Sequence, residues 1–564
     1  MTSTINGHCS ERYIVPKEKH FWLSIIALLS LVLFAVQVNA NQALKNLKPG
    51  QWYKFPTHSY SKMNSVTPPN NRAPNAPPEF SYDWRFFSKS VMDAWGGGAY
   101  DTKKNRLIIW GGGHADYVGN EVYAFNLEEV TSQGTGRWRR LTTPSTVPLN
   151  CNLRSSALKF TIENREGDPN GCLTEEIEIM GDGQPVSRHT YDSLQYLPSN
   201  ISNGNVLWAQ GGSRWPTGKC SKVLWFLNLE NNVWKQKIQN AGTTKECELS
   251  VFSAYDVNTK SVFSFNHNTA GHKVLMRHNI TTGSWTEVVN NHVINFSTGT
   301  TSDDTAADNL TAAIHPGKKM MIALGGVKGN KVVSYDLKNI TINNKATFKE
   351  VPTNGATEIT QCSGPGFDYD NKSQQLVAWC NTDDIYVLDI KTMRWSKQAP
   401  TSPNTESPRL PSDSNGTYGR FRYVPKYNVF VLATGTQQDV YAYKRSTLDA
   451  DGNGGKDDAL TDGLLFMRYM FGLRGDALIS GAVDTSCTRC TSAQIESYVK
   501  QVGEELRSDI DGNGEVDALT DGLLISRYLF GSTENALIQD AIGDGCTRCT
   551  APEITKYLGT LSTK

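Results

Sequence analysis

Val122-Tyr-Ala-Phe-Asn126-Leu127 is the first of five similar phrases in this sequence of 564 residues. The other four also run from apolar and aromatic residues into Asn or Asp and then an aliphatic residue: Leu224-Trp-Phe-Leu-Asn228-Leu229, Leu275-Met-Arg-His-Asn279-Ile280, Val332-Val-Ser-Tyr-Asp336-Leu337 and Ile385-Tyr-Val-Leu-Asp389-Ile390. A shorter copy, Val440-Tyr-Ala-Tyr443, follows them. Runs of this kind between turn residues predict short β-strands.

Each phrase lies between two other recurring features. Most copies lead to an aromatic residue that opens another strand: Trp138, Trp234, Trp285, Phe348 and Trp395. Upstream, several strands end in paired glycines, at 111–113, 211–212 and 325–326. A repeat of roughly 50 residues with several strands per unit is typical of a β-propeller. These residues resemble kelch repeats, and the resemblance implies a mainly β protein with a kelch-like propeller over 94–446.

The spacing of the Asn or Asp positions bears on the number of blades. Successive steps are 102, 51, 57 and 53 residues, so the first step is twice the others. Six blades with an insertion over about 142–187 explain this spacing, and we favour that reading. Seven blades remain the alternative, with strands at 157–163 and 175–180. The last copy lacks a fourth strand, and we expect 51–55 to supply it and close the ring.

The N-terminal region predicts export. An apolar run over 21–40 follows Lys17 and Lys19 and ends in Val38-Asn39-Ala40. We read 1–40 as a signal peptide, which implies a secreted protein with no membrane segment after cleavage. An uncleaved membrane anchor is the alternative. Residues 41–93 form an N-terminal segment rich in Pro and Asn. The 56 basic and 56 acidic residues balance, which argues against nucleic-acid binding.

Ten cysteines follow residue 40, and an even number in an exported chain favours disulfides. Neighbours in the sequence suggest Cys151–Cys172, Cys220–Cys247 and Cys362–Cys380, among many possible pairings. The last four form Cys-Thr-Arg-Cys twice, at 487–490 and 546–549. Local disulfides are favoured there over a zinc site.

The C-terminal region carries a second repeat. Asp449-Ala-Asp451-Gly-Asn453-Gly454 and Asp509-Ile-Asp511-Gly-Asn513-Gly514 both continue into Ala-Leu-Thr-Asp-Gly-Leu-Leu, and each precedes helix-like apolar periods. Oxygen ligands at alternate positions, then a Gly for a sharp turn, suit Ca²⁺. Residues 447–564 resemble a dockerin, the duplicated calcium-binding module that tethers polysaccharide-degrading enzymes to cohesins. The resemblance therefore implies a small α-helical domain.

The resemblance implies ligands for two Ca²⁺ ions. Those of the first loop are Asp449, Asp451, Asn453, Asp458 and Asp462, and those of the second are Asp509, Asp511, Asn513, Glu515 through its carbonyl, Asp517 and Asp521. The closing acids fall at loop positions 14 and 13, where the family has position 12. The tail has either a cohesin-like protein partner or no partner at all.

Three polar segments of the propeller region could carry chemistry, at 110–121, 187–192 and 419–422. From these and the neighbouring Arg214 we expect five side chains to converge near the central channel: His114, His189, Tyr191, Arg214 and Arg420. His and Tyr near Arg suit β-elimination on a uronic-acid polysaccharide. Arg or His would neutralise the carboxylate, and Tyr or His would move the proton.

The sequence leaves open whether the propeller is an enzyme. A lyase acting on an extracellular polysaccharide is preferred to a glycoside hydrolase, and a non-catalytic propeller that binds glycan or protein is the alternative. A galactose-oxidase-like copper site needs a cysteine cross-linked to tyrosine, and every exported cysteine here has a plausible disulfide partner. For His267, His272 and His278 we expect a solvated loop rather than a metal site.

Overall fold

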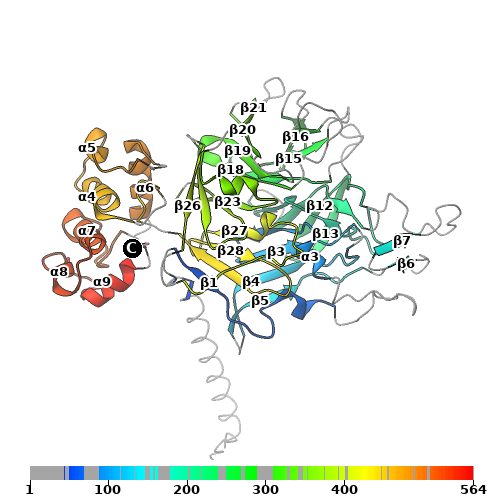
Figure 1. Ribbon diagram of the computed structural model, residues 1–564, viewed down its shortest axis with the longest axis horizontal. Helices are drawn as coiled ribbons and strands as arrows, with labels where there is room; N and C mark the ends of the chain where they lie inside the picture. Colours follow the sequence, from blue (N-terminus) through cyan, green and yellow to red (C-terminus); the bar gives the residue numbers. More distant parts are fainter. Residues whose placement is uncertain are drawn as a thin grey trace, which may run out of the picture.

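The computed structural model describes residues 43–562, apart from 69–87, 146–152, 163–177, 239–248, 289–308, 341–346 and gaps of up to five residues. The predicted signal peptide therefore lies outside the described residues. The structure is mainly β and forms a six-bladed propeller, followed by a helical tail (Figure 1).

Each blade is built on four antiparallel strands, and in the fifth blade the short strand β22 (Asn354–Gly355) adds a fifth, parallel strand at the edge. The first three blades contain β2 (Gly97–Asp101), β3 (Arg106–Trp110), β4 (Tyr123–Thr131) and β5 (Gly134–Arg140); β9 (Leu194–Leu197), β10 (Val206–Ala209), β12 (Val223–Asn228) and β13 (Val233–Ile238); and β14 (Ser253–Asp256), β15 (Ser261–His267), β16 (Lys273–Asn279) and β17 (Trp285–Glu287). The last three contain β18 (Leu310–His315), β19 (Met320–Gly325), β20 (Lys331–Asp336) and β21 (Thr347–Glu350); β23 (Gly366–Asp370), β24 (Gln375–Trp379), β25 (Ile385–Asp389) and β26 (Arg394–Gln398); and β27 (Phe421–Val424), β28 (Val429–Ala433), β29 (Val440–Lys444) and β1 (Trp52–Lys54). The repeated phrases are the third strands, as their aliphatic and aromatic content predicts.

The first strands of the blades form the inner wall of the ring. Strands β2, β9, β14, β18, β23 and β27 contact one another in that order, and β27 returns to β2. The predicted closing strand is confirmed, because β1 pairs with β29 with Trp52 opposite Tyr443. Both ends of the propeller thus share one blade, which closes the ring.

The long first step between repeats is an insertion and not a seventh blade. It contains a separate hairpin of β6 (Leu153–Ser156) and β7 (Lys159–Ile162), and then β8 (Arg188–His189), which pairs with β11 (Ser213–Arg214). The seven-blade alternative is therefore wrong, because these strands join none of the four-stranded sheets. The pair β8 and β11 lies next to the candidate site described below.

A cluster of charged side chains and their hydrogen-bond partners in the middle of the ring joins all six blades. The Arg422 guanidinium contacts Asp192 (3.2 Å), Asp368 (3.8 Å) and the Gly98 carbonyl. Asp192 also accepts a hydrogen bond from the amide of Ala312 (2.8 Å), and its carbonyl accepts one from the hydroxyl of Ser253. These groups come from blades six, two, five, one, four and three. Burial raises the pKa of Asp192 to about 7, against the opposing effect of Arg422.

Three predicted disulfides are confirmed: Cys362–Cys380, Cys487–Cys490 and Cys546–Cys549. The last two exclude the zinc alternative for the Cys-Thr-Arg-Cys motifs. Cys220 is also disulfide-bonded, whereas its predicted partner Cys247, like the pair Cys151 and Cys172, lies outside the described residues. Among the helices that the structure describes, none is long and apolar enough to cross a membrane.

The tail contains two copies of one helical unit around a shared apolar core. The helices are α4 (Leu464–Met470), α5 (Asp476–Ile479) and α6 (Ser492–Glu504) in the first copy, and α7 (Leu523–Phe530), α8 (Glu534–Ile538) and α9 (Ala551–Leu558) in the second. A short π-helical turn precedes each set, η6 (Ala459–Gly463) and η7 (Ala518–Gly522). Outside the tail lie α3 (Ser90–Asp93), η1 (Met63–Val66), η3 (Pro316–Lys318), η4 (Thr357–Gln361), η5 (Tyr418–Arg420) and the short strand β22 (Asn354–Gly355).

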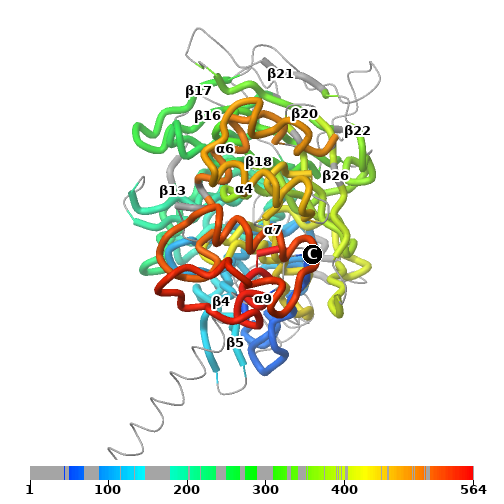
Figure 2. Tube along the Cα trace, turned by 90° about the vertical axis from the view of Figure 1, so that its left-hand side faces the viewer, coloured from blue at the N-terminus to red at the C-terminus, as the bar shows by residue number. Residues whose placement is uncertain are grey.

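The tail docks on one side of the propeller (Figures 1 and 2). Arg445, after β29, forms an ion pair with Asp370 (3.3 Å) and donates to Gln375 (2.8 Å), both at the turn between β23 and β24. At the same turn, Arg489 of the first copy donates to the carbonyl of Ser373 (3.0 Å). The first copy of the tail unit therefore lies against the fifth blade.

Candidate functional site

The backbone is strained where the chain enters the inner strands. Trp95, Tyr191, Asn309 and Tyr418 have φ angles of 49°, 48°, 65° and 49°, and Gly364 has 57°. Each lies one to three residues before an inner strand, in five different blades. Aromatic residues rarely adopt this left-handed conformation, and residues held in it often gather at functional sites. We call these five positions the mouth residues.

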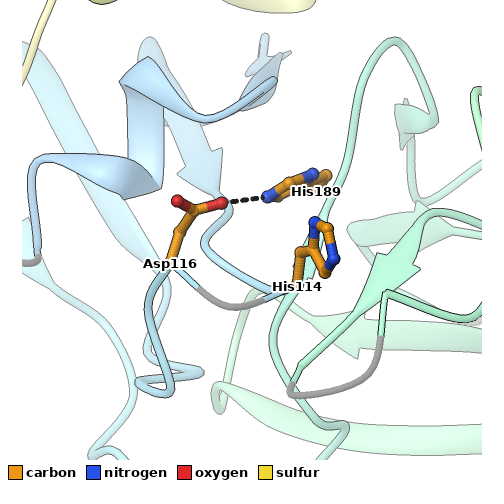
Figure 3. Close-up of side chains that lie close together, drawn as sticks. All are labelled: His114, Asp116 and His189. Atoms are coloured by element: carbon orange, nitrogen blue, oxygen red, sulfur yellow. Dashed lines mark hydrogen bonds and ion pairs between the residues drawn. The ribbon is translucent and has the colours of Figure 1, made fainter. Parts of the chain in front are cut away.

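Two of the predicted catalytic residues meet beside the mouth residues. His189 of β8 lies 2.7 Å through its Nε2 from the Oδ2 atom of Asp116, and its ring centroid is 5.6 Å from that of His114 (Figure 3). His114 is exposed, Asp116 is half-buried, and His189 is 2% exposed. The cluster thus has a buried anchor and an accessible face.

A glycine permits the close approach that builds this cluster. The loop after β3 returns at Gly113, whose φ is 79°, and a Cβ there would lie 2.2 Å from the Cα of Arg188. The next residue, His114, has a φ of 42° and donates its amide to the carbonyl of Ser213 (3.3 Å). The Gly-Gly-Gly-His motif therefore sets the loop directly against β8 and β11.

Aromatic rings surround the cluster on the mouth side. The Trp95 ring lies 4.8 Å from that of His189 and 6.3 Å from that of Tyr191. Tyr191 in turn lies 6.2 Å from His189 and 5.8 Å from Tyr418. Trp95 and Tyr191 are half-buried, whereas Tyr418 is fully buried and donates its hydroxyl to Asn309 (2.8 Å). Of the three rings, Trp95 and Tyr191 remain accessible to a ligand.

Arg420 has a different environment from the one expected. Its guanidinium is fully buried and donates to the carbonyls of Gly96 (2.9 Å), Ala433 (2.8 Å), Thr434 (3.0 Å) and Gly416. Burial lowers its pKa to about 10. These bonds fasten the sixth blade to the first, so we leave Arg420 out of the proposed site.

Arg214 is also engaged with protein groups. It is 6% exposed, donates to the carbonyl of Cys220 (2.9 Å) and lies 3.6 Å from the carboxylate of Glu178. Arg188, the neighbour of His189, is fully buried 3.9 Å from the same Glu178. Arg214 and Arg420, the two arginines predicted as catalytic, therefore both bond to groups within the fold.

Sequence reasoning identified His114, His189 and Tyr191 but did not select Trp95 or Asp116 as site residues. Asp116 is two residues from His114 in the first polar segment, and its spacing gave no sign that it would reach His189. A usable signal for Trp95 exists in the sequence. It lies directly before the Gly-Gly that opens β2, the position that Tyr418 occupies before Gly419.

The two predicted calcium loops each bring three carboxylates together. Ligand atoms of Asp449, Asp451 and Asp462 lie within 4.8 Å of one another, as do those of Asp509, Asp511 and Asp521. All six residues are buried. Burial raises the pKa of Asp451 and that of Asp521 to about 6, and the neighbouring carboxylates add to the effect. Clustered hard oxygen donors of this kind fit Ca²⁺.

Other predicted ligands have structural contacts. Asp458 and Asp517 cap the π-helical turns, where each carboxylate accepts two backbone amides, from Leu460 and Thr461 and from Leu519 and Thr520. The backbone N–H groups of Asn453 and Asn513 donate to the carboxylates of Asp451 and Asp511 at 3.0 and 3.1 Å. Glu515 is exposed, and its backbone N–H donates to the side-chain oxygen of Asn513. Despite the extra residue in the first loop, Asp462 and Asp521 occupy equivalent places.

The arginine of each Cys-Thr-Arg-Cys motif donates hydrogen bonds to its predicted calcium loop. Arg489 donates to the carbonyls of Ala450 and Asp449, and its guanidinium lies 3.9 Å from the centroid of the Tyr498 ring. Arg548 repeats these contacts with the carbonyls of Ile510 and Asp509 and, at 4.0 Å, with the ring of Tyr557. Only Arg489 also bonds to the propeller.

This matched pair gives a prediction. Arg489→Met and Arg548→Met should both weaken Ca²⁺ binding, because each removes two charged hydrogen bonds worth about 1.5 to 3 kcal/mol apiece. Only Arg489→Met should release the tail from the propeller. Proteolytic cleavage between the two, followed on gels, should be faster in Arg489→Met and unchanged in Arg548→Met. Equal cleavage rates would contradict the docking role of Arg489.

The expectation of a solvated histidine loop is wrong for His278. This residue is 1% exposed in β16, stacks on Trp285 with centroids 4.6 Å apart and accepts a hydrogen bond from the indole of Trp208 (3.1 Å). His272 lies outside the described residues, and the side chain of His267 is not described. His278 is therefore part of the core between the second and third blades.

Comparison with known proteins gives no basis for assigning a function. No family model matches the chain, and no curated protein matches it. Among solved structures, one titled "Structure of YjhT" matches with 10% sequence identity over 63% of this chain and 93% of that chain, at a TM-score of 0.34. A TM-score this low carries no argument about activity, so the function is argued from the residues of the site.

Proposed function

We propose that this is a secreted, kelch-type propeller that acts on an extracellular uronic-acid polysaccharide at the mouth residues. The observation that carries the proposal is the convergence of Tyr191, His189 and His114 beside the half-buried ring of Trp95. An accessible indole provides an apolar surface for a sugar ring, and the adjacent imidazoles and phenol can move protons.

The reaction that best suits this set is β-elimination. Tyr191 or His189 removes the proton at C5 of the uronate, and the electron pair of the C5–H bond forms the C4=C5 double bond. The C4–O bond then breaks, and the departing oxygen takes up a proton from one of the same side chains. No water is consumed. Positioned proton transfer of this kind contributes typically about 10²- to 10⁴-fold to the rate.

The test is an absorbance assay on a panel of uronic-acid polysaccharides, read at the wavelength of the unsaturated product. Tyr191→Phe should lower kcat/KM at least about 100-fold, because it removes a proton-transfer group and keeps the ring. Tyr60→Phe is the matched control, since Tyr60 is exposed on the outer rim beside Arg137. Full activity in Tyr191→Phe would exclude it as the proton-transfer group and leave that step to His189.

Binding without cleavage is the second candidate function. It is favoured by one observation, that Arg214 and Arg420 are both committed to protein groups and cannot serve to neutralise a carboxylate. Gel retardation on the same polymers with no absorbance change would support it. Absence of both retardation and cleavage across the panel would contradict the proposal that the ligand is a polysaccharide.

For the tail we propose a dockerin-like calcium-binding module that connects the propeller to a cohesin-like protein partner. Two carboxylate clusters in equivalent places, each braced by the arginine of a disulfide loop, support two bound Ca²⁺ ions. The disulfides and the oxygen-only donor sets both suit the oxidising, calcium-rich space outside the cell.

A further inference from the structure

The two arginines expected at the proposed polysaccharide site are both bonded to other protein groups. Elimination beside a carboxylate needs positive charge near that carboxylate, since the C5 carbanion delocalises onto it. The two arginines expected to supply the charge are bonded elsewhere, Arg420 to four carbonyls and Arg214 to Glu178 and Cys220. If the proposed function is correct, an imidazolium of the histidine pair or a bound metal ion supplies this charge.

We infer that His114, Asp116 and His189 bind a divalent transition-metal ion of the Zn²⁺ class. One ligand atom of each residue lies within 4.8 Å of the other two. Bonds of about 2.0 to 2.2 Å place tetrahedral ligand atoms about 3.3 to 3.6 Å apart, so rotation of these side chains would bring the three atoms onto one ion. Two imidazoles and one carboxylate are a donor set that suits Zn²⁺ and neighbouring transition metals, and it does not suit Ca²⁺.

The geometry leaves a coordination position for a ligand. His114 and Asp116 come from one loop and His189 from the short strand β8, and Figure 3 shows the three side chains close together. They supply three of the four ligands of a tetrahedral ion. Exposed His114 and half-buried Asp116 mark the accessible side, and the Trp95 and Tyr191 rings adjoin His189. A uronate carboxylate could take the remaining position, with its sugar beside Trp95.

The protein already fixes two of the three ligands. The amide of His114 is held by Ser213, and the amide of Asp116 donates to the carbonyl of Gly113 (2.9 Å). A bound ion would replace the present hydrogen bond between Asp116 and His189, because both atoms would face the metal. His189 would then be a ligand, and the proton transfers of the proposed elimination would fall to Tyr191. Without an ion, Asp116 only orients the His189 ring through this hydrogen bond. With an ion, Asp116 is a ligand, so Asp116→Asn should lower the affinity for Zn²⁺.

The other acidic and sulfur groups do not obscure the test. Among the described residues, the two further candidate clusters are all-carboxylate, and millimolar Ca²⁺ occupies such sites in preference to Zn²⁺. The described cysteines are in disulfides and offer no thiolate. Zinc titrated in the presence of Ca²⁺ therefore reports on the histidine cluster.

The experiment uses residues 41–564, stripped with chelator, returned to millimolar Ca²⁺ and titrated with Zn²⁺ by calorimetry. We expect one Zn²⁺ per chain, a higher melting temperature of the propeller with Zn²⁺, and at least a 100-fold loss of affinity in His114→Ala and in Asp116→Asn. His58→Gln is the control, because this histidine bonds to Gly136 on the outer rim. It should bind Zn²⁺ as the wild type does.

Binding measured without substrate separates this inference from the proposed function. Wild-type protein that takes up no Zn²⁺, or variants that bind it as well as the control, would overturn the metal site. Asp116→Asn conserves the shape of a half-buried side chain, so this variant is expected to fold. If Zn²⁺ binds as expected and no polymer is cleaved, only the lyase proposal fails.

Discussion

Replacing Arg422 by methionine should lower the free energy of unfolding of the propeller by about 3 to 5 kcal/mol, because removal of one partner leaves buried charge unpaired. Arg422 is 7% exposed and is the cation that contacts both Asp192 and Asp368. Without it, two carboxylates from opposite parts of the ring face each other. The cluster joins every blade, so the loss should destabilise the ring as a whole.

The effect should depend on pH. Burial already raises the pKa of Asp192 to about 7, and loss of Arg422 raises it further. Between the unfolded pKa of about 3.9 and the folded value, the folded variant binds more protons than the unfolded chain. Its stability therefore falls as pH rises through this window, and the penalty of the substitution should be smaller at pH 5 than at pH 8.

Urea denaturation followed by tryptophan fluorescence measures the propeller alone, because all 13 tryptophans precede residue 447. Arg409→Met is the control. Its pair with Asp383 has a normal distance of 2.7 Å, but the two side chains are 47% and 42% exposed. Exposed pairs contribute about 0 to 1 kcal/mol. Similar losses in the two variants would refute the role assigned to the central cluster.

The sequence predicted the propeller well because each blade repeats the same local pattern. Third strands such as 122–127 and fourth strands opened by Trp138 or Trp395 carry their β-strand signal within a few residues. The closing strand at Trp52 could be predicted for the same reason: its pattern matches the fourth strands, and the last repeat lacked one. Blade number also followed, since an insertion explains one doubled spacing.

The sequence failed where a residue's role depends on distant backbone. Arg420 was taken for a catalytic group, but its partners are carbonyls of residues 96, 416, 433 and 434, which meet only in the closed ring. Trp95 was missed because its importance comes from a left-handed φ and from the ring of His189, 94 positions later. The contact with His189 leaves no local pattern, and the aromatic residue before glycine, shared with Tyr418, is recognisable only once the backbone conformation is known.

Removing Ca²⁺ should unfold the tail and leave the propeller folded. Free Ca²⁺ at about 100 times its Kd stabilises a one-site protein by about 2.7 kcal/mol, so two such sites contribute about 5 kcal/mol. Without the ions, three buried carboxylates repel one another in each loop; burial and that repulsion hold the pKa of Asp462 well above its usual range. The shared core between the copies means that both halves should unfold together.

Two signals separate the domains in this experiment. On addition of chelator, the helical circular dichroism of the tail should be lost, while the tryptophan fluorescence of the propeller should not change.

Asp462→Asn should give the same loss at lower chelator concentrations, because it weakens the first loop at the carboxylate that also accepts the amides of Ala450 and Asp458. Asp540→Asn is the matched control, an exposed acid outside both loops with a φ of 54°, which asparagine tolerates. A tail that keeps its helical signal in excess chelator would show that its fold does not depend on bound ions. The carboxylate clusters would then be structural acids, held by the backbone amides that already donate to them.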